Sequence, residues 1–303
     1  MCSSISKSPI KPRLIPTKLR ETLSSKLSVP RENIYTIPNI LTFSRLIATP
    51  IIGYLIIHNH HLYAFYLFAY AGFSDLLDGW IARKWKLQTV VGSVVDPMAD
   101  KVLMTTLVGC LAVNGALPLP LAILILGRDA SLAVAAIYYR YASLPSPKTL
   151  ARYWDFSLPS AEVHPTTVSK LNTFLQLGLI GATMCVGLMN DPAAISSAAG
   201  GLLDSIKDSL GGQEGVRSVI MQLQAAVAST TIWSGLSYTW TKDAVKILGP
   251  DEALKRKQGF LGRMIVAGSF GAVLVLTAWL ALRDRRKTEA EEEGKGKDIE
   301  ERR

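Results

Sequence analysis

The chain has 303 residues, of which 49% are hydrophobic, and its mean hydropathy is +0.25. Soluble domains of this size are less apolar, so the composition favours a membrane protein. The net charge of +9 does not indicate nucleic-acid binding, because the lysines and arginines lie in alternate loops between apolar segments. The three cysteines have no paired spacing and indicate neither a disulfide framework nor a cysteine metal site.

The first 36 residues are basic, rich in serine and poor in acidic residues. This composition is typical of a mitochondrial transit segment. The prolines within it disfavour the amphipathic helix that such a segment forms. A basic arm lying on an anionic membrane surface is therefore the alternative interpretation.

Seven apolar runs follow, each near the roughly 20 residues that a helix needs to cross the hydrocarbon core. They comprise residues 39–57, 62–82, 92–113, 119–141, 168–189, 216–240 and 264–282. We expect an all-α integral membrane protein with a six-helix transmembrane bundle over residues 37–246. An extra C-terminal apolar helix is predicted within residues 247–282, after a basic loop. The charged tail, residues 283–303, is predicted to be solvated and disordered.

Basic residues are concentrated before the first apolar run and after the second, fourth and sixth runs. The positive-inside rule therefore puts these ends, including the N-terminus, on one side of the membrane. The seventh run departs from this rule, because it would carry the basic stretch 283–287 to the other side. A re-entrant or surface-lying helix is the alternative for that run.

Four aspartates mark the second and third runs: Asp75, Asp78, Asp96 and Asp100. Spacings of three and four residues put each pair on one helix face. In an antiparallel helix pair the four carboxylates then meet near one membrane face. Four anions in apolar surroundings need a neutralising partner, and carboxylate oxygens suit Mg²⁺, Mn²⁺ or Ca²⁺. We predict a divalent-metal site and disfavour solvated surface acids, because intramembrane acids are costly.

Gly79, Ala82, Arg83 and Gly92 complete the pattern D-x2-D-G-x2-A-R-x8-G-x3-D-x3-D. This pattern resembles the signature of the CDP-alcohol phosphatidyltransferases. Members of that family join an alcohol to the phosphoryl group of a CDP-activated lipid and release CMP. The resemblance implies a membrane-helix fold and a divalent metal, which we expect to be Mg²⁺ or Mn²⁺, with Co²⁺ as an alternative.

The acceptor hydroxyl must lose its proton during attack, so we assign Asp100 as the general base, as the resemblance also implies. The metal ligands are expected to be Asp75, Asp78 and Asp96, with Asp100 touching the metal as well. The residues expected to contact CDP-diacylglycerol are Asp78, Gly79, Ala82, Arg83 and Gly92. The alternative for the small residues is ordinary packing between membrane helices, and for Arg83 it is snorkelling to the interface.

Further segments resemble the eukaryotic cardiolipin synthases, a branch of this family. They are residues 35–39, 53–57, 128–129, 144–154 and 165–176. The resemblance implies transfer of a phosphatidyl group from CDP-diacylglycerol to phosphatidylglycerol. It also implies a homodimer in the mitochondrial inner membrane, with the site facing the matrix and membrane lipids as its surroundings.

The acceptor headgroup is predicted to contact Arg152 and Lys170, which lie on the same side of the membrane as the aspartates. General attraction to a lipid surface would produce the same composition. The enzyme alternative is a phosphatidylglycerophosphate synthase that uses glycerol 3-phosphate. The non-enzyme alternative is an intramembrane cation transporter, whose acids would be spread across several helices. A phospholipase-D-like route is excluded, because no His-x-Lys pair is present.

Overall fold

The computed structural model describes most of the chain after the basic arm. The described residues are 36–85, 89–144, 148–149, 153, 162–163, 166–197, 200–240, 245–246 and 252–300. The predicted transit segment, up to residue 35, lies outside them.

Long helices form the described part of the chain, and they match the seven predicted apolar runs. They are α2 (Ile37–Ile57), α3 (His61–Lys84), α4 (Val90–Val113), α5 (Leu119–Ser143), α7 (Thr167–Met189), α10 (Gly212–Trp240) and α11 (Glu252–Glu300). Short helices α8 (Pro192–Ile195) and α9 (Gly200–Ser209) connect α7 to α10. The predicted all-α class is thereby confirmed.

Polar caps fix where two of these helices begin. The side chain of Thr89 accepts a hydrogen bond from the backbone N–H of Gly92 at the start of α4. Thr166 does the same for the N–H of Ser169 at the start of α7. Such caps satisfy donors that the first helical turn leaves without a partner, so each helix starts at a defined residue.

Four described stretches are long and apolar enough to cross a membrane: Ile37–Ile57, Leu119–Ser143, Thr167–Met189 and Arg256–Lys287. Helices α3 and α4 have similar lengths, but they carry the four signature aspartates together with basic residues. The chain is therefore a membrane protein with several apolar helices. The predicted seventh run lies inside the last of these stretches.

Two local features differ from the sequence-based prediction. The two-residue strands β1 (Glu162–Val163) and β2 (Val245–Lys246) form an antiparallel pair within predicted loops. The pair joins the α5–α7 connection to the α10–α11 connection. Backbone pairing between segments so far apart in the chain has no local sequence signal, which explains why it was not predicted.

The prediction of a disordered tail from residue 283 was wrong in its secondary structure. Helix α11 continues through Glu300, past the apolar run. The segment after Leu282 is composed largely of glutamate, arginine and lysine and has no proline, although it includes Gly294 and Gly296. These residue types favour helix strongly, so the helix continues beyond the apolar stretch.

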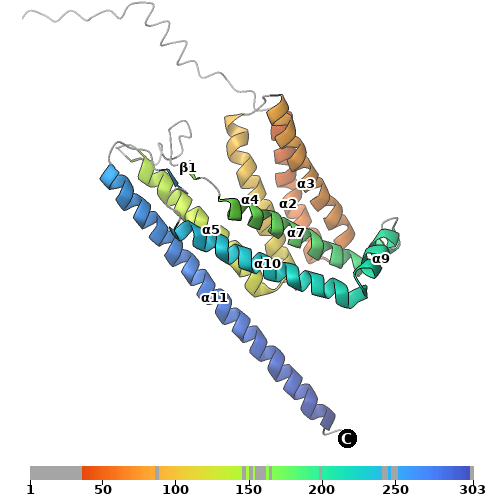
Figure 1. The fold of residues 1–303 in the computed structure, drawn as a ribbon. Coiled ribbons are helices and arrows are strands. Elements are labelled where there is room, and N and C mark those ends of the chain that lie inside the picture. The colour runs from red at the N-terminus through yellow and green to blue at the C-terminus, as the bar shows by residue number, and fades with distance from the viewer. Residues whose placement is uncertain are drawn as a thin grey trace, which may run out of the picture.

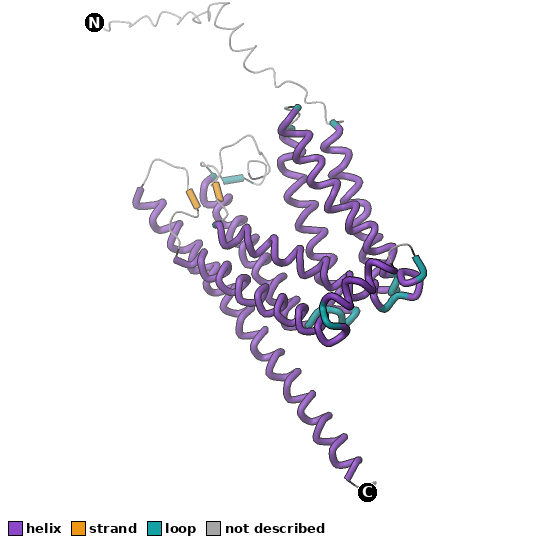
Figure 2. Tube along the Cα trace, turned by 45° about the vertical axis from the view of Figure 1, so that its right-hand side comes forward, coloured by secondary structure: helices purple, strands orange, loops and turns teal. Residues whose placement is uncertain are grey.

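Helices α2, α3 and α4 lie side by side, while α5, α7, α10 and α11 pack beside them at a different inclination (Figure 1). The main apolar core joins both groups, with Ile52, Leu107 and Ile180 among its fully buried side chains. The C-terminal end of α11 projects beyond the other helices, as Figures 1 and 2 both show. The core therefore holds the three-helix group against the remaining helices.

Helix α11 packs closely on α5 and α10 because glycines leave space for its side chains. A Cβ atom added at Gly235 of α10 would lie 2.3 Å from Cε1 of Phe270, and one at Gly127 of α5 would lie 2.5 Å from Cγ1 of Val273. Phe270 is almost fully buried. The position of α11 thus depends on the absence of side chains at these two positions.

We expect the substitution Gly235→Ala to destabilise the protein by about 1–3 kcal/mol, because the added methyl group overpacks the contact with Phe270. Thermal unfolding of the detergent-solubilised protein, followed by circular dichroism, measures this. The matched control is Gly271→Ala in α11, where an added Cβ meets nothing within 4 Å. The control should be neutral or slightly stabilising. Equal effects of the two substitutions would contradict this account of α11.

Candidate functional site

A stripe of polar side chains runs along one face of the otherwise apolar helix α2. Asn39, Thr42, Arg45 and Thr49 are spaced by three or four residues, so they lie on the same face. All four are buried. Because α2 packs against both α3 and α4, this face meets the two helices that carry the signature aspartates.

Arg45 makes the contacts between this face of α2 and the aspartates of α3 and α4. Its Nη1 lies 2.7 Å from Oδ1 of Asp75 and also donates to Asp100, while its Nη2 lies 2.5 Å from Oδ2 of Asp78. The arginine side chain is only 1% exposed. One buried guanidinium therefore gathers three of the four predicted carboxylates, from two different helices.

The fourth carboxylate is held by a neighbouring hydroxyl. Thr42 donates a hydrogen bond of 2.6 Å to Oδ1 of Asp96, and its oxygen lies 3.5 Å from Oδ2 of Asp78. Thr42 lies one turn before Arg45 on the same face of α2. The structure thus brings all four signature aspartates together against two side chains of α2.

The four carboxylates differ in their access to the outside of the protein. The side chain of Asp78 is 8% exposed, whereas those of Asp75 and Asp100 are 48% and 51% exposed. The site is therefore closed on the side of α2 and open on the side of Asp75 and Asp100. A substrate would reach the latter two residues first.

The donor set fits a divalent cation in its chemistry. Four carboxylates face one arginine, so the described site carries an excess of negative charge within apolar helices, and oxygen ligands suit Mg²⁺ or Mn²⁺. Among the described residues, no three acidic, histidine or cysteine side chains form a ready-made metal cluster. In this arrangement the carboxylates are gathered by Arg45, which supplies part of the compensating charge.

The predicted nucleotide-contacting residues lie on the same two helices. A Cβ at Gly79 would lie 3.4 Å from Nη1 of Arg83, so the exposed arginine folds back over the glycine. Ala82 is half-buried on α3. Gly92 is different, because a Cβ there would lie 2.7 Å from Oδ1 of Asn39. This close approach to α2 favours the packing alternative for Gly92.

Of the two predicted acceptor residues, the structure describes only Lys170, and among the described residues it forms no ion pair with the four carboxylates. Arg152 lies outside the described residues. Lys170 is exposed on the first turn of α7. Its neighbour Ser169 accepts a 2.6 Å hydrogen bond from Nη2 of Arg128, a buried residue of α5.

Sequence reasoning missed the roles of Thr42 and Arg45. Arg45 lies inside the first predicted apolar run, and the sequence alone assigns no partner to it. The signal that was present is the polar stripe on α2, which recurs every three or four residues through an otherwise apolar helix. A buried arginine on such a stripe requires carboxylate partners, and the only intramembrane acid clusters nearby in sequence are those of the signature.

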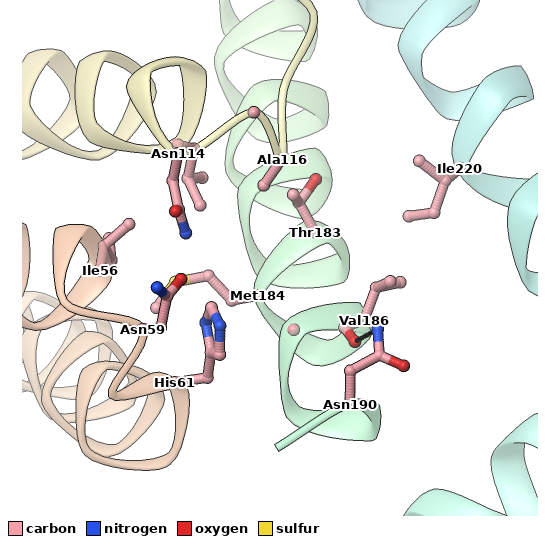
Figure 3. A pocket seen from close by; sticks show the side chains of 13 residues that line it. Ile56, Asn59, His61, Asn114, Ala116, Thr183, Met184, Val186, Asn190 and Ile220 are labelled. Carbon is pink, nitrogen blue, oxygen red and sulfur yellow. Dashed lines mark hydrogen bonds between the residues drawn. The ribbon is translucent and has the colours of Figure 1, made fainter.

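A separate cavity of about 320 Å³ lies at the opposite ends of these helices (Figure 3). Asn59 from the α2–α3 connection, His61 at the start of α3 and Asn114 from the end of α4 point into it, beside α7. Among the described residues that line it, none is acidic. The cavity is therefore distinct from the carboxylate site.

Comparison with known proteins gives a match to the family model described as CDP-alcohol phosphatidyltransferase over residues 35–195. This range contains α2, the four aspartates and Lys170, and it covers more than half of the chain.

Individual relatives agree with this match. The chain is 42% identical over 238 residues to a cardiolipin synthase (CMP-forming) / mitochondrial hydrolase fusion protein of Schizosaccharomyces pombe, covering 78% of this chain and 36% of that protein. It is 43% identical over 160 residues to the human cardiolipin synthase (CMP-forming), covering 52% and 53%. It is 32% identical over 216 residues to a chloroplastic CDP-diacylglycerol–glycerol-3-phosphate 3-phosphatidyltransferase of Oryza sativa, covering 69% and 57%. The chain thus spans between about one third and just over half of the length of these relatives.

We expect Arg45→Gln to destabilise the protein strongly in EDTA, because breaking a buried ion pair costs about 3–5 kcal/mol. Added Mg²⁺ should restore part of the lost thermal stability, since it replaces the missing positive charge. Thermal unfolding with and without Mg²⁺ measures both effects. The control is Arg217→Gln, at an exposed position near the start of α10. Unchanged stability of Arg45→Gln in EDTA would refute the neutralising role.

Proposed function

Because the chain belongs to the CDP-alcohol phosphatidyltransferase family, we propose that it transfers a phosphatidyl group from CDP-diacylglycerol to phosphatidylglycerol and releases CMP. The product of that reaction is cardiolipin. The observation that carries the proposal is the convergence of four carboxylates from α3 and α4 on Arg45 and Thr42, open on one side. Such a site provides both oxygen ligands for a divalent cation and a base for a hydroxyl group.

The four aspartates have different proposed roles. Asp75, Asp78 and Asp96 would hold the divalent cation, and Asp100 would contribute to it and act as the general base. When bound, Mg²⁺ or Mn²⁺ supplies positive charge against the diphosphate of the donor. Asp100 suits the base role because it is half-exposed and an acceptor hydroxyl reaches it from the open side.

The reaction is a substitution at phosphorus. The acceptor hydroxyl oxygen forms a bond to the phosphorus that carries diacylglycerol, and its proton passes to Asp100. The bond between that phosphorus and the bridging diphosphate oxygen breaks, and CMP leaves with the bridging oxygen. The protein contributes chiefly by orienting the two substrates and balancing their charge.

The donor is proposed to lie along α3 at the level of Gly79. Gly79 has no side chain, so a substrate can approach the helix backbone at this point, and the guanidinium of Arg83 lies beside it. Arginine is suited to phosphate groups, because its planar fork of N–H donors matches their oxygens. The small side chain of Ala82 likewise leaves space beside the same part of α3. Asp78 and Gly92 complete the proposed donor site.

Phosphatidylglycerol is preferred as the acceptor because the relatives with 42% and 43% identity are named cardiolipin synthases. The runner-up acceptor is glycerol 3-phosphate, which the name of the 32% identical rice relative specifies. Arg152 and Lys170 stay the proposed contacts of the acceptor headgroup. A cation transporter is less well supported, because the four acids lie on only two helices, α3 and α4.

The proposed location is the mitochondrial inner membrane, with the carboxylate site facing the matrix and the protein forming a homodimer. Support for the compartment comes from the basic, serine-rich N-terminal segment and from the mitochondrial name of the fission-yeast relative. Support for the orientation comes from the basic loops on the side of the site.

The acceptor assignment is tested with purified protein, Mg²⁺ and CDP-diacylglycerol, offered separately with phosphatidylglycerol, glycerol 3-phosphate, inositol and serine. We expect cardiolipin and CMP only with phosphatidylglycerol, identified by mass spectrometry. Parallel reactions in EDTA serve as the control and should give no product. Efficient use of glycerol 3-phosphate would instead identify the runner-up activity.

The base assignment is tested by comparing Asp100→Asn with Asp75→Asn, Asp78→Asn and Asp96→Asn. Asp100→Asn should reduce transfer by about 10²–10⁴-fold, the usual contribution of a general base, while retaining most donor binding. The other three should weaken Mg²⁺-dependent binding of CDP-diacylglycerol. Calorimetry in lipid nanodiscs measures binding, and product formation measures transfer. If all four variants lose donor binding equally, Asp100 acts primarily as a ligand.

A further inference from the structure

A second charged cluster lies next to the carboxylate site, on α4 and α5. The ammonium group of Lys101 lies 2.5 Å from Oδ2 of Asp129, and Nη1 of Arg128 lies 2.6 Å from Oδ1 of the same aspartate. Nη2 of Arg128 also donates to the hydroxyls of Ser169 on α7 and Ser234 on α10, each at 2.6 Å. Side chains from four helices thus support one cluster.

The cluster has one more positive than negative charge. Lys101 and Arg128 are two cations, and Asp129 is their only carboxylate partner among the described residues. The neighbouring site, in contrast, has four carboxylates against Arg45. A cluster with excess positive charge, which suits an anion, therefore lies beside a site with excess negative charge, which suits a cation.

The two cations of the cluster are not equivalent. The side chain of Arg128 is 3% exposed and held by an aspartate and two hydroxyls, and its buried Nε has no hydrogen-bond partner among the described atoms. Lys101 is 58% exposed and holds a single partner. Arg128 alone already compensates Asp129, so neutralisation of the aspartate does not account for Lys101. Charged groups on membrane helices are usually paired or functional, and the exposed part of this ammonium group is available to an anionic ligand.

The position of Lys101 relates it to the reaction. It directly follows Asp100 on α4, so its side chain leaves the helix about 100° around the axis from the proposed base. The proposed acceptor carries a hydroxyl and a phosphate joined by one glycerol unit. A cation beside the base is placed to bind that phosphate while the hydroxyl meets Asp100.

We propose that Lys101, held by Asp129, binds the phosphate of the glycerol-linked acceptor next to Asp100. The inference rests on the proposed function and names a binding residue for its acceptor. Arg128, Ser169 and Ser234 hold Asp129 and the surrounding helices in place. The shared chemistry is a phosphate that bears a glycerol, which phosphatidylglycerol and glycerol 3-phosphate both offer.

The test uses the full-length protein in nanodiscs with Lys101→Met, which keeps the length of the side chain and removes its charge. We expect the KM for phosphatidylglycerol to rise roughly tenfold or more, as for loss of a charge-assisted phosphate contact. The KM for CDP-diacylglycerol should change by less than about twofold, since that substrate does not meet Lys101. Lys101→Arg should restore most of the acceptor affinity, and Asp129→Asn should raise the acceptor KM with the lysine still present.

The matched control is Lys207→Met on α9, a helix that carries none of the residues of either charged cluster. Thermal unfolding of each variant establishes that it is folded, and Lys101→Gln replaces the methionine variant if that one does not fold. An unchanged acceptor KM in the folded variants, or equal rises for both substrates, would overturn the proposal. A rise in the acceptor KM with Lys170→Ala but not with Lys101→Met would assign the phosphate contact to Lys170 on α7 and overturn the proposal.

The same assays are run with glycerol 3-phosphate. Use of glycerol 3-phosphate by the unmodified protein refutes the proposed function alone, and the effect of Lys101→Met is then read on that acceptor. An unchanged KM in Lys101→Met for whichever acceptor the unmodified protein uses refutes the role of Lys101 alone.

Discussion

The arrangement of α2, α3 and α4 depends on one buried ionic interaction, that of Arg45 with the signature carboxylates. An arginine buried to this extent is stable only with charged partners, and aspartates within apolar helices equally need a cation. Because the partners come from two helices, the interaction specifies how both pack against α2. The i, i+3 and i, i+4 spacings place the carboxylates where one guanidinium reaches three of them. The requirement for charge balance thus determines how α3 and α4 pack against α2. It also determines that the site is closed on the side of Arg45 and open on the side of Asp75 and Asp100.

Helix α4 connects the two charged clusters. One face presents Asp100 to Arg45, and the next residue presents Lys101 to Asp129. Charges of opposite sign on adjacent faces would lose their effect if α4 could rotate about its axis. Rotation is opposed at its start, where Gly92 fits closely against Asn39 of α2, and by the packing of the core along its length. The same contacts that stabilise the fold therefore keep the proposed base and its neighbouring cation apart.

The sequence predicts much of this architecture, because its strongest signals are local. Apolar runs predict the helices, and the aspartate spacings predict a shared face. The partners of those aspartates were not predicted, since Arg45 lies 30 to 55 positions away in the chain from the carboxylates it binds. The close contact of Gly92 with Asn39 is a similar case, because it depends on how two separate helices pack. The continuation of α11 reflects helix propensity, which here outweighs the high charge of the segment.

Helix α11 lies outside the family match, which ends at residue 195, yet it packs directly behind the second cluster. Gly127, which receives Val273, immediately precedes Arg128, and Gly235, which receives Phe270, immediately follows Ser234. The two glycines thus adjoin the two residues that hydrogen-bond to each other between α5 and α10. Side chains of α11 fill the space behind this hydrogen bond and hold the two helices at the separation that it requires. The extra helix therefore supports the cluster that positions Lys101, although none of the ion pairs described for that cluster involves a residue of α11.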